Sequence, residues 1–397
     1  PRDTDKTGFD RSFTIYDTDD SKRVIKDILK EMGLEEKTFP VREVLSVISN
    51  AKDAMMMPEE FSQLWEQRGD WRRVRMGRVY AAYNRRLRDA NALDFDDIIL
   101  HTVELLQSDR QTLEYYRNKF RYVLIDEYQD TNHMQYMLAS LLAGGRKNIC
   151  VVGDPAQTIY SFAGASSYNL LNFASEFGPL TADVRLNNDY RSTPQIVNYA
   201  NRVLEASPQR ADYLKLNSKR DPGRRVSQTI YNSDLEEARG VAARIRRLVD
   251  EGASPGDCAI LTRVNAQQKI LCRALGEQHL RYRVKRDSGW QNSALADDAQ
   301  TRLAMLEALG AGGDVKGVTI STIHASKGLE FKHVFLIGCS EGLIPYGSPP
   351  EGDLLEEERR LMYVAVTRAE DTLDVSYARA REDDGSDRGR RKSRFFR

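Results

Sequence analysis

The sequence predicts an α/β protein with two parallel-sheet domains and a helical subdomain. Residues 1–92 carry apolar side chains at helical spacing among charged ones, as in Ser21–Met32 and Arg78–Ala90. From Phe120 onward, short β-branched and aromatic runs alternate with helical stretches. Such alternation is typical of parallel sheets, because each parallel connection needs a crossover, which is usually a helix.

Composition sets limits on the class of protein. The 397 residues are 41% hydrophobic and 30% charged, which allows two or three cores and excludes bulk disorder. Lys and Arg total 59 and Asp and Glu total 59, so affinity for nucleic acid has to come from local basic surface. The four cysteines lack zinc-ligand spacing, and no membrane-spanning run or signal peptide occurs. We expect a soluble cytoplasmic protein, truncated at its N-terminus because it begins with Pro.

The first sheet is predicted within residues 93–185. The runs FRYVLIDE, from Phe120, and NICVVGD, from Asn148, are short apolar segments that end in acids. Two buried parallel strands separated by a helix fit this pattern best. Their carboxyl ends share one rim of the sheet, which is where open α/β sheets bind ligands.

The second α/β domain is predicted over residues 186–397. Helical stretches such as Leu235–Glu251 and Glu356–Val366 separate the strand-like runs VSQTIY, CAILTR, VTISTI, HVFLIG and LDVSYA. Residues 285–317 are polar, contain glycines and show little strand character, so we expect a short connector there. The tail, residues 385–397, is strongly basic and is expected to be mobile; it could bind DNA or a partner, or be a solvated end.

Acidic residues follow the first predicted strand. Asp126 and Glu127 end VLIDE, where one carboxylate can hold Mg²⁺ and the other can orient an attacking water. An isolated Asp-Glu pair would more simply be a solvated strand end. The next strand ends in GDPAQTIY, which places Asp154 and Gln157 on the same rim, where a glutamine could sense a γ-phosphate. The four residues together favour nucleotide hydrolysis.

Two aromatic residues follow on the next loop. Tyr160 and Phe162 suit stacking on unpaired bases, which is worth ~1–3 kcal/mol per base. Packing into a core is an equally good interpretation for Phe162.

Three further segments follow DEYQD and GDPAQTIY in order: NDYRSTPQIVNYAN, TISTIHASKGLEF and EEERRLMYVAVTRAED. Together the five segments closely resemble the successive motifs of UvrD/PcrA/Rep-like superfamily I DNA helicases. The resemblance covers nearly the whole chain, including ALDFDD at Ala92–Asp97. It implies two RecA-like, P-loop NTPase-type domains with a helical accessory subdomain at residues 1–92. It also implies ATP and Mg²⁺ as cofactors, single-stranded DNA and single/double-strand junctions as partners, and repair proteins as further candidates.

The resemblance also implies roles for residues of the first motifs. Asp126 would hold Mg²⁺ and Glu127 would act as the catalytic base on water, which agrees with the interpretation from the residues. Gln157 would couple the γ-phosphate to the DNA-contacting loops. Tyr190 resembles the residue that packs on the adenine, and Arg191 resembles an arginine that reaches the γ-phosphate from the second domain.

The later motifs supply the remaining expected site residues. Arg368 resembles a second such arginine, and arginines of this kind can contribute ~10³–10⁵ in rate. Outside such motifs an arginine would more simply make a surface salt bridge. Glu330 resembles the carboxylate that contacts the ribose, while Thr322, His324 and Lys327 lie on the loop that links nucleotide state to the DNA backbone. A lone histidine is usually structural, which is the alternative for His324.

The sequence departs from the family in three places. No G-x-x-x-x-G-K-[ST] occurs, so this chain is expected to hydrolyse ATP poorly or not at all. Relatives carry a whole inserted domain where this chain has only residues 285–317. Where the family often has YRWRGA, this chain has YSFAGA, with Ser161 and Ala163 in place of arginines, which weakens phosphate contact.

The predicted function is an ATP-dependent DNA helicase and translocase of repair or replication. Its 3′ to 5′ direction comes from the resemblance alone. The main alternative is a non-hydrolysing module that binds single-stranded DNA or a repair partner; the joint presence of the residues assigned to hydrolysis disfavours it. A helicase-nuclease is a third alternative, but no nuclease-like carboxylate cluster follows Arg368.

Overall fold

A computed structural model describes most of the chain. The described residues are 2–145, 147–160, 168–286, 289–292, 317–347, 350–380 and 389–396. They form two compact units, Pro1–Thr181 (unit 1) and Ala182–Arg397 (unit 2). Both contain helices and parallel strands, which confirms the predicted α/β class.

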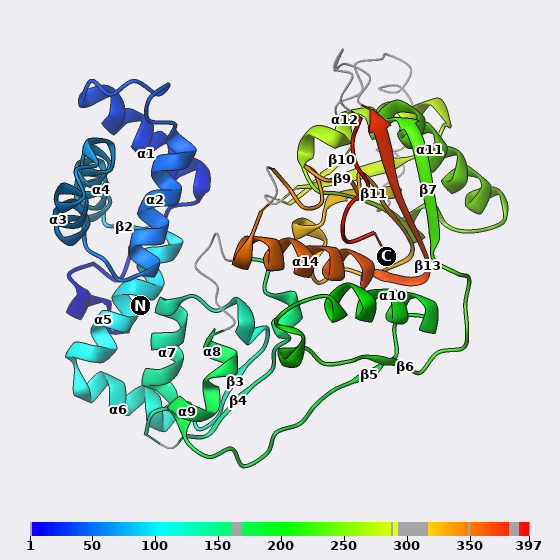
Figure 1. Cartoon of the computed structure of the whole chain (residues 1–397). Helices are drawn as coiled ribbons and strands as arrows, with labels where there is room; N and C mark the ends of the chain where they lie inside the picture. Colours follow the sequence, from blue (N-terminus) through cyan, green and yellow to red (C-terminus); the bar gives the residue numbers. More distant parts are fainter. Residues whose placement is uncertain are drawn as a thin grey trace. The chain divides into compact units, whose positions relative to one another are not determined.

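Unit 1 begins with a group of helices that pack on one another (Figure 1). These are α1 (Thr18–Glu31), α2 (Val41–Asp53), α3 (Pro58–Gln67) and α4 (Trp71–Asp89), preceded by the 3-10 turn η1 (Thr4–Thr7). Local sequence sets their starts, since Asp17 and Asp70 accept hydrogen bonds from the first backbone N–H groups of α1 and α4. Their inward faces form one apolar core that includes Ile25, Val44 and Tyr83. The helical prediction for this region is therefore confirmed in the main.

One feature of the first 92 residues was not predicted. The two-residue strands β1 (Thr14–Ile15) and β2 (Ala92–Leu93) pair in parallel, so the region is not all helical. Two residues are too few to show the alternation that identifies a strand in sequence.

The rest of unit 1 surrounds a small parallel sheet. Its helices are α5 (Phe95–Ser108), α6 (Arg110–Lys119), α7 (His133–Ala143), α8 (Tyr168–Leu171) and α9 (Phe173–Phe177), with the 3-10 turns η2 (Tyr128–Asp130) and η3 (Pro155–Gln157). Strand β3 (Val123–Ile125) pairs in parallel with β4 (Ile149–Val151), and α7 lies between them in sequence. This arrangement confirms the predicted strand–helix–strand order. The strands are less buried than predicted, since Leu124 is 77% exposed.

Unit 2 is built on a seven-stranded sheet in the order β10-β9-β11-β8-β12-β13-β7. The strands are β7 (Ser227–Ser233), β8 (Cys258–Thr262), β9 (Tyr282–Arg286), β10 (Gly289–Asn292), β11 (Val318–Thr322), β12 (Phe331–Leu336) and β13 (Ala369–Ala380). Every neighbouring pair is parallel except β9–β10. All five predicted strand-like runs of this domain are confirmed.

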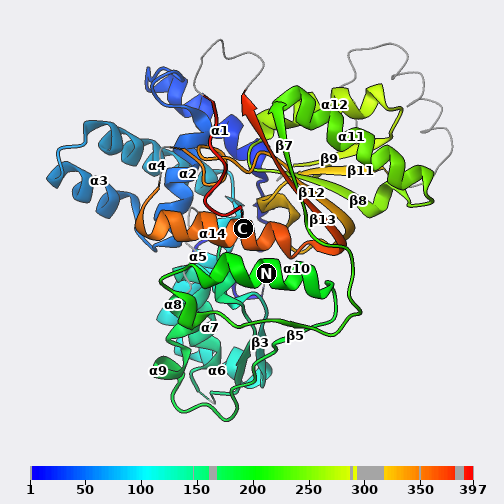
Figure 2. The ribbon, with the colours of Figure 1, turned by 45° about the vertical axis from the view of Figure 1, so that its right-hand side comes forward.

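Helices cover both faces of this sheet (Figure 2). They are α10 (Pro194–Glu205), α11 (Asp234–Asp250), α12 (Gln268–Glu277) and α14 (Gly352–Val366), and a short β5 (Asn188–Asp189) pairs with β6 (Asn217–Ser218). The 3-10 turns are η5 (Arg210–Asp212), η6 (Pro255–Asp257), η7 (Asn265–Gln267) and η8 (His324–Ser326). Helices α11 and α12 share an apolar core with β8, β11 and β12. A parallel sheet covered in this way explains why β8 and β11 read as continuous apolar runs.

The predicted connector at 285–317 begins with strand structure, so the expectation of little strand character is wrong for residues 285–286 and 289–292. Residue 285 belongs to β9, and β10 pairs with β9 as an antiparallel hairpin. The side chains of Tyr282 and Val284 pack on the core, while Arg283 donates to the Thr319 hydroxyl at 3.1 Å. This alternation of apolar and basic residues is the strand signal that was overlooked. Residues 287–288 and 293–316 lie outside the described residues.

The basic tail is docked over residues 389–396, so the prediction that it is mobile is wrong for this segment. Phe395 and Phe396 are buried, and the Arg359 guanidinium lies 5.1 Å from the Phe395 ring. The Ser393 N–H donates to the Cys339 carbonyl at 3.0 Å. The prediction weighed the charges of the tail and neglected its two phenylalanines, whose burial stabilises the docked end.

Candidate functional site

The carboxyl ends of β3 and β4 form the first part of the candidate site. The Tyr128 N–H donates to the Val152 carbonyl at 2.9 Å, and the Val152 N–H donates to the Ile125 carbonyl at 2.8 Å. These bonds hold the segments after the two strands together. The structure therefore brings the predicted residues Asp126 and Glu127 to the same rim as the loop after β4.

The acidic pair sits in an unusual backbone conformation. Glu127 has φ 52° and ψ 40°, which is the left-handed helical region. For a residue with a side chain this region costs roughly 1–2 kcal/mol. The Glu127 N–H donates to the Asp126 carboxylate at 2.9 Å, and both side chains are exposed. Strain of this kind concentrates at functional sites, where the surrounding structure maintains it.

A residue that sequence reasoning missed connects the two strand ends. Gln129 is completely buried, its amide Nε2 donates to Glu127 Oε2 at 2.6 Å, and its Oε1 accepts from the Asp154 N–H at 3.0 Å. A Cβ on Gly153 would lie only 2.6 Å from that Oε1, so the backbone passes close to the amide. Sequence gave no signal for Gln129, because an amide inside DEYQD follows no periodic pattern.

The turn after β4 holds the predicted Gln157. Asp154 caps the turn η3 through the Ala156 N–H at 2.9 Å, and Gln157 Nε2 donates to the other carboxylate oxygen of Asp154 at 2.9 Å. Tyr160 is half-buried a few residues later. Phe162, with its neighbours Ser161 and Ala163, lies outside the described residues. Asp126, Glu127, Asp154 and Gln157 thus belong to one hydrogen-bonded rim.

Unit 2 gathers a second set of predicted residues. Arg191 Nε forms an ion pair with Glu330 Oε2 at 2.6 Å, and Arg191 also donates to the Thr367 carbonyl at 3.4 Å. Thr367 precedes the predicted Arg368, so three motifs that are distant in sequence meet here. Tyr190, next to Arg191, is 75% exposed.

Backbone and hydroxyl hydrogen bonds hold these three motifs together. The Arg191 N–H donates to the Asp189 carboxylate at 2.8 Å, which fixes the turn before α10. The Ser192 hydroxyl donates to the Ala369 carbonyl at 2.6 Å, and the Thr193 N–H donates to the Glu370 carbonyl at 3.0 Å. The start of α10 is therefore tied to the start of β13.

Arg368 is held inside unit 2 in this conformation. Its side chain is buried and donates to the carbonyls of Val364 at 3.1 Å and Leu329 at 3.0 Å. Leu329 precedes Glu330, so the guanidinium lies beside the acid that pairs with Arg191. Because Arg368 is only 3% exposed, its guanidinium has to become more accessible before it can contact a phosphate.

The loop after β11 carries the predicted DNA-contacting residues. Thr322 Oγ1 accepts from the Ala325 N–H at 3.1 Å and so starts the turn η8, which contains His324 and leads to Lys327. Burial, together with the nearby Arg263, lowers the pKa of His324 to about 4. At neutral pH His324 is therefore uncharged and can contact a phosphate only as a hydrogen-bond donor.

Arg263, at the end of β8, is a second residue that sequence reasoning missed. Its guanidinium pairs with Glu358 at 2.6 Å and lies 5.0 Å from the Tyr346 ring. A single arginine after a strand gives no sequence signal of such an arrangement.

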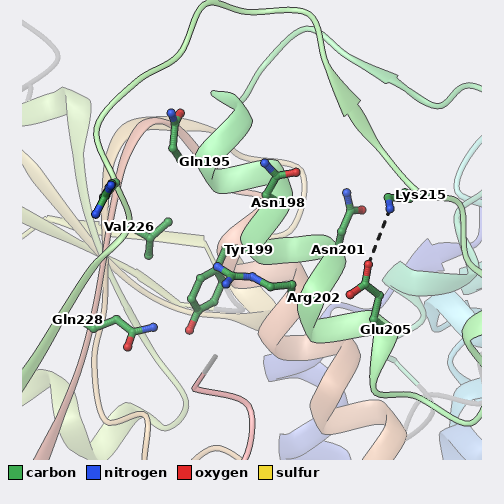
Figure 3. A pocket seen from close by; sticks show the side chains of 10 residues that line it. Gln195, Asn198, Tyr199, Asn201, Arg202, Glu205, Lys215, Val226 and Gln228 are labelled. Atoms are coloured by element: carbon green, nitrogen blue, oxygen red, sulfur yellow. Dashed lines mark ion pairs between the residues drawn. The ribbon is translucent and has the colours of Figure 1, made fainter.

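A separate hollow of about 540 Å³ lies beside α10 in unit 2 (Figure 3). Its lining includes Asn198, Tyr199, Arg202 and Gln228, and Lys215 and Glu205, which also line it, form an ion pair at 3.9 Å. It contains none of the predicted site residues.

Comparisons with known proteins decide the family. The UvrD/REP helicase N-terminal domain matches residues 2–178, and the UvrD-like helicase C-terminal domain matches residues 184–289 and 299–380. The chain belongs to the UvrD-like helicase family. The mixed α/β structure with its parallel sheets agrees with the RecA-type domains of this family, so the resemblance carried by the five motifs is confirmed.

Individual relatives of the UvrD-like family agree with this assignment. The chain is 34% identical to the ATP-dependent DNA helicase UvrD2 of Mycobacterium tuberculosis H37Rv over 95% of this chain and 65% of that protein. It is 28% identical to PcrA of Staphylococcus aureus MRSA252 over 100% of this chain and 73% of the relative, and 39% identical to PcrA of Bacillus subtilis 168 over 71% and 38%. Both PcrA proteins are also named ATP-dependent DNA helicases. This UvrD-like chain thus spans just under two thirds of the length of UvrD2.

The donor set of this UvrD-like chain fits a magnesium ion that is shared with a nucleotide. Mg²⁺ is usually bound through one or two carboxylates together with substrate phosphates. Asp126 is an exposed residue directly after β3, and its Oδ1 accepts a hydrogen bond from the Glu127 N–H. Among the described residues no three His, Cys, Asp or Glu side chains group into a metal site, and no helix there is long and apolar enough to cross a bilayer.

Proposed function

We propose that this chain is the motor part of an ATP-dependent DNA helicase that moves 3′ to 5′ on single-stranded DNA in repair or replication. The observation that carries the proposal is the hydrogen-bonded rim of unit 1, where Asp126, Glu127 and Gln157 lie together. We further propose a helical accessory subdomain at residues 1–92, a first RecA-like domain at 93–185 and a second at 186–397.

In the proposed reaction Glu127 is the general base. Its carboxylate takes a proton from a water whose oxygen forms a bond to the γ-phosphorus of ATP, while the bond from that phosphorus to the β,γ-bridging oxygen breaks and ADP leaves. Asp126 would hold Mg²⁺, which neutralises charge on the phosphates. Gln157 would contact the γ-phosphate and couple the binding of that phosphate to the conformation of the loop that carries Tyr160.

Residues of unit 2 would complete nucleotide recognition. The exposed ring of Tyr190 would stack on the adenine, and Glu330 would accept a hydrogen bond from the ribose. Arg191 and Arg368 would donate to the γ-phosphate, because guanidinium donors match phosphoryl oxygens. The ion pair of Arg191 with Glu330 supports this, since one acid keeps the arginine oriented until a phosphate competes for it.

The proposed DNA contacts come from both units. Tyr160 and Phe162 would stack on bases, and Thr322, His324 and Lys327 would contact the backbone. Single-stranded DNA and single/double-strand junctions are the proposed substrates, and repair proteins are candidate partners.

We also propose that residues 1–397 alone hydrolyse ATP poorly or not at all, because the sequence contains no G-x-x-x-x-G-K-[ST] to bind the phosphates. The alternative is a non-hydrolysing module that binds single-stranded DNA or a repair partner. The rim geometry favours the motor, because a binding module has no need of a carboxylate held in a strained conformation.

The test is ATP hydrolysis stimulated by single-stranded DNA. Residues 1–397 are compared with the full product of the gene that encodes them, each with and without Glu127→Gln. We expect hydrolysis in the full gene product and a loss of about 10²–10⁴-fold in Glu127→Gln. If the full gene product binds DNA but hydrolyses nothing, the binding module replaces the motor. Unwinding of duplexes with a 3′ or a 5′ overhang then tests the direction.

A further inference from the structure

The side chain of Gln129 is a buried polar group that is hydrogen-bonded at both ends. It has no exposed surface, and a buried amide is tolerated only when both of its ends are hydrogen-bonded. Its Nε2 donates to Glu127 Oε2 and its Oε1 accepts from the Asp154 N–H. A packing residue at this place could have been apolar, so the two bonds need their own explanation.

The bond to Glu127 determines where that carboxylate points. Glu127 is exposed and lies in the left-handed backbone region. An exposed glutamate ordinarily samples several rotamers. A 2.6 Å bond from a buried amide to a carboxylate oxygen is a short, charge-assisted contact that selects one of them. The second carboxylate oxygen, Oε1, is thereby held in a defined direction.

The opposite end of Gln129 is fixed by the loop after β4. The Asp154 N–H donates to Gln129, and the Asp154 carboxylate accepts from Gln157 Nε2. A continuous path therefore runs from Glu127 through Gln129 and Asp154 to Gln157. The backbone at Gly153 packs closely against the Gln129 amide, because a methyl group at Gly153 would lie only 2.6 Å from Gln129 Oε1.

We propose that Gln129 is a positioning residue that aims the Glu127 carboxylate at the attacking water and links it to Gln157. This inference rests on the proposed ATP hydrolysis. A shift of the Gln157 turn would move Asp154, and through Gln129 it would move the base. The chemistry would then depend on the state of the segment that contacts DNA.

Two substitutions separate the two bonds of Gln129. Gln129→Glu keeps an oxygen to accept from the Asp154 N–H, but it places a second carboxylate against Glu127 and removes the donor. Gln129→Met keeps the length of the side chain and removes both bonds. The matched control is Gln135→Glu, which makes the same change at the start of the adjacent helix α7, where Gln135 is exposed and caps that helix.

The first measurement is steady-state ATP hydrolysis by the full gene product. We expect kcat to fall about 10²-fold in both Gln129 variants while the KM for ATP stays within about twofold, because a misplaced base slows the chemical step and leaves ground-state binding intact. Gln135→Glu should keep the parent kcat. An unchanged kcat in Gln129→Glu, with the parent protein active, would overturn the inference while leaving the proposed function in place.

The second measurement does not depend on hydrolysis. Crystal structures of the parent chain and of Gln129→Glu should show the Glu127 carboxylate displaced in the variant, with the pairing of β3 and β4 retained. If the full gene product without substitutions hydrolyses no ATP, the proposed function fails, but the two crystal structures still test whether Gln129 positions the Glu127 carboxylate. A Glu127 carboxylate that keeps its place without the Gln129 donor contradicts the positioning role.

Discussion

The two units position their candidate residues by different means. In unit 2 every residue of β8 and β11 is buried, and the site residues lie on loops at the ends of a seven-stranded sheet. In unit 1 the sheet has two strands, and Leu124 is 77% and Val152 51% exposed. Hydrophobic burial is therefore the main support in unit 2. The unit 1 rim depends more on hydrogen bonds and on a strained Glu127 backbone.

The contrast predicts first that core substitutions act very unequally. Ile260→Ala, in the centre of β8, should lower the unfolding free energy of unit 2 by about 2–5 kcal/mol, because Ile260 is completely buried. Leu124→Ala, in the centre of β3, should change unit 1 by less than about 0.5 kcal/mol, because its side chain is largely exposed. Urea unfolding of both variants measures the difference. Equal losses would show that the face of β3 is covered in solution.

A second prediction concerns backbone fit at glycines. Gly153→Ala should destabilise unit 1 by about 1–3 kcal/mol, because its Cβ would meet Gln129 Oε1 at 2.6 Å and a Leu170 methyl at 3.0 Å. Gly276→Ala is the matched change in unit 2. Gly276 is exposed within α12 with nothing near its missing Cβ, so alanine should stabilise by roughly 0.5–1 kcal/mol through helix propensity.

Thermal unfolding of the two alanine variants should therefore shift in opposite directions. Stabilisation by Gly153→Ala would mean that the Gln129 amide can move away without loss. That result would weaken the view that this part of unit 1 is rigid.

Periodicity in the sequence predicted the regular parts of both units. The runs that became β7, β8, β11, β12 and β13 were recognisable because a covered parallel sheet requires apolar residues throughout. The alternation of Tyr282 and Val284 with basic residues marked β9 equally well but was overlooked beside a glycine-containing stretch. The docking of Phe395 was missed because its partner Arg359 is distant in sequence.

The candidate site was predictable only where a motif marks it. Asp126, Glu127, Arg191, Glu330 and Arg368 could be named from the resemblance, and the structure places the last three side by side. Gln129 and Arg263 carry no local pattern. Gln129 contacts Asp154 and Arg263 contacts Glu358, and both partners are distant in sequence. A single sequence does not show which distant residues pair in this way.

A third prediction is that one titrating group in each unit responds to pH with opposite sign. Burial, with Asp96 nearby, raises the pKa of Asp53 from its ordinary range to about 7. The folded state then binds this proton more tightly than the unfolded state, so the contribution of Asp53 is lost as pH rises from about 4 to 7. His324, with its pKa lowered to about 4, contributes fully above pH 6.5 and loses that contribution as pH falls toward 4.

Asp53→Asn and His324→Gln isolate the two contributions. Asp53→Asn keeps an oxygen to accept from Asn132 Nδ2, which donates to Asp53 at 2.7 Å, and should stabilise unit 1 at pH 8 but not at pH 4. His324→Gln should reduce the loss of unit 2 stability between pH 6.5 and 4. Each effect is expected to be on the order of 1 kcal/mol once solvent screening is allowed for. Unfolding free energies measured across this range give the slopes, and parallel slopes for parent and variant would contradict the assignment.

The smallest expected stability effect belongs to the ion pair between Arg191 and Glu330. The two side chains are 37% and 55% exposed, so Glu330→Gln should change the unfolding free energy of unit 2 by less than about 0.5 kcal/mol. Asp257→Asn, which breaks the comparably exposed pair with Lys332, is the matched control and should have an equally small effect. The two variants should differ in nucleotide binding, because only Glu330 is proposed to contact the ribose. Weaker binding of ATP by Glu330→Gln alone would show that this pair serves the site, whereas equal binding by both variants would reduce it to one more surface salt bridge.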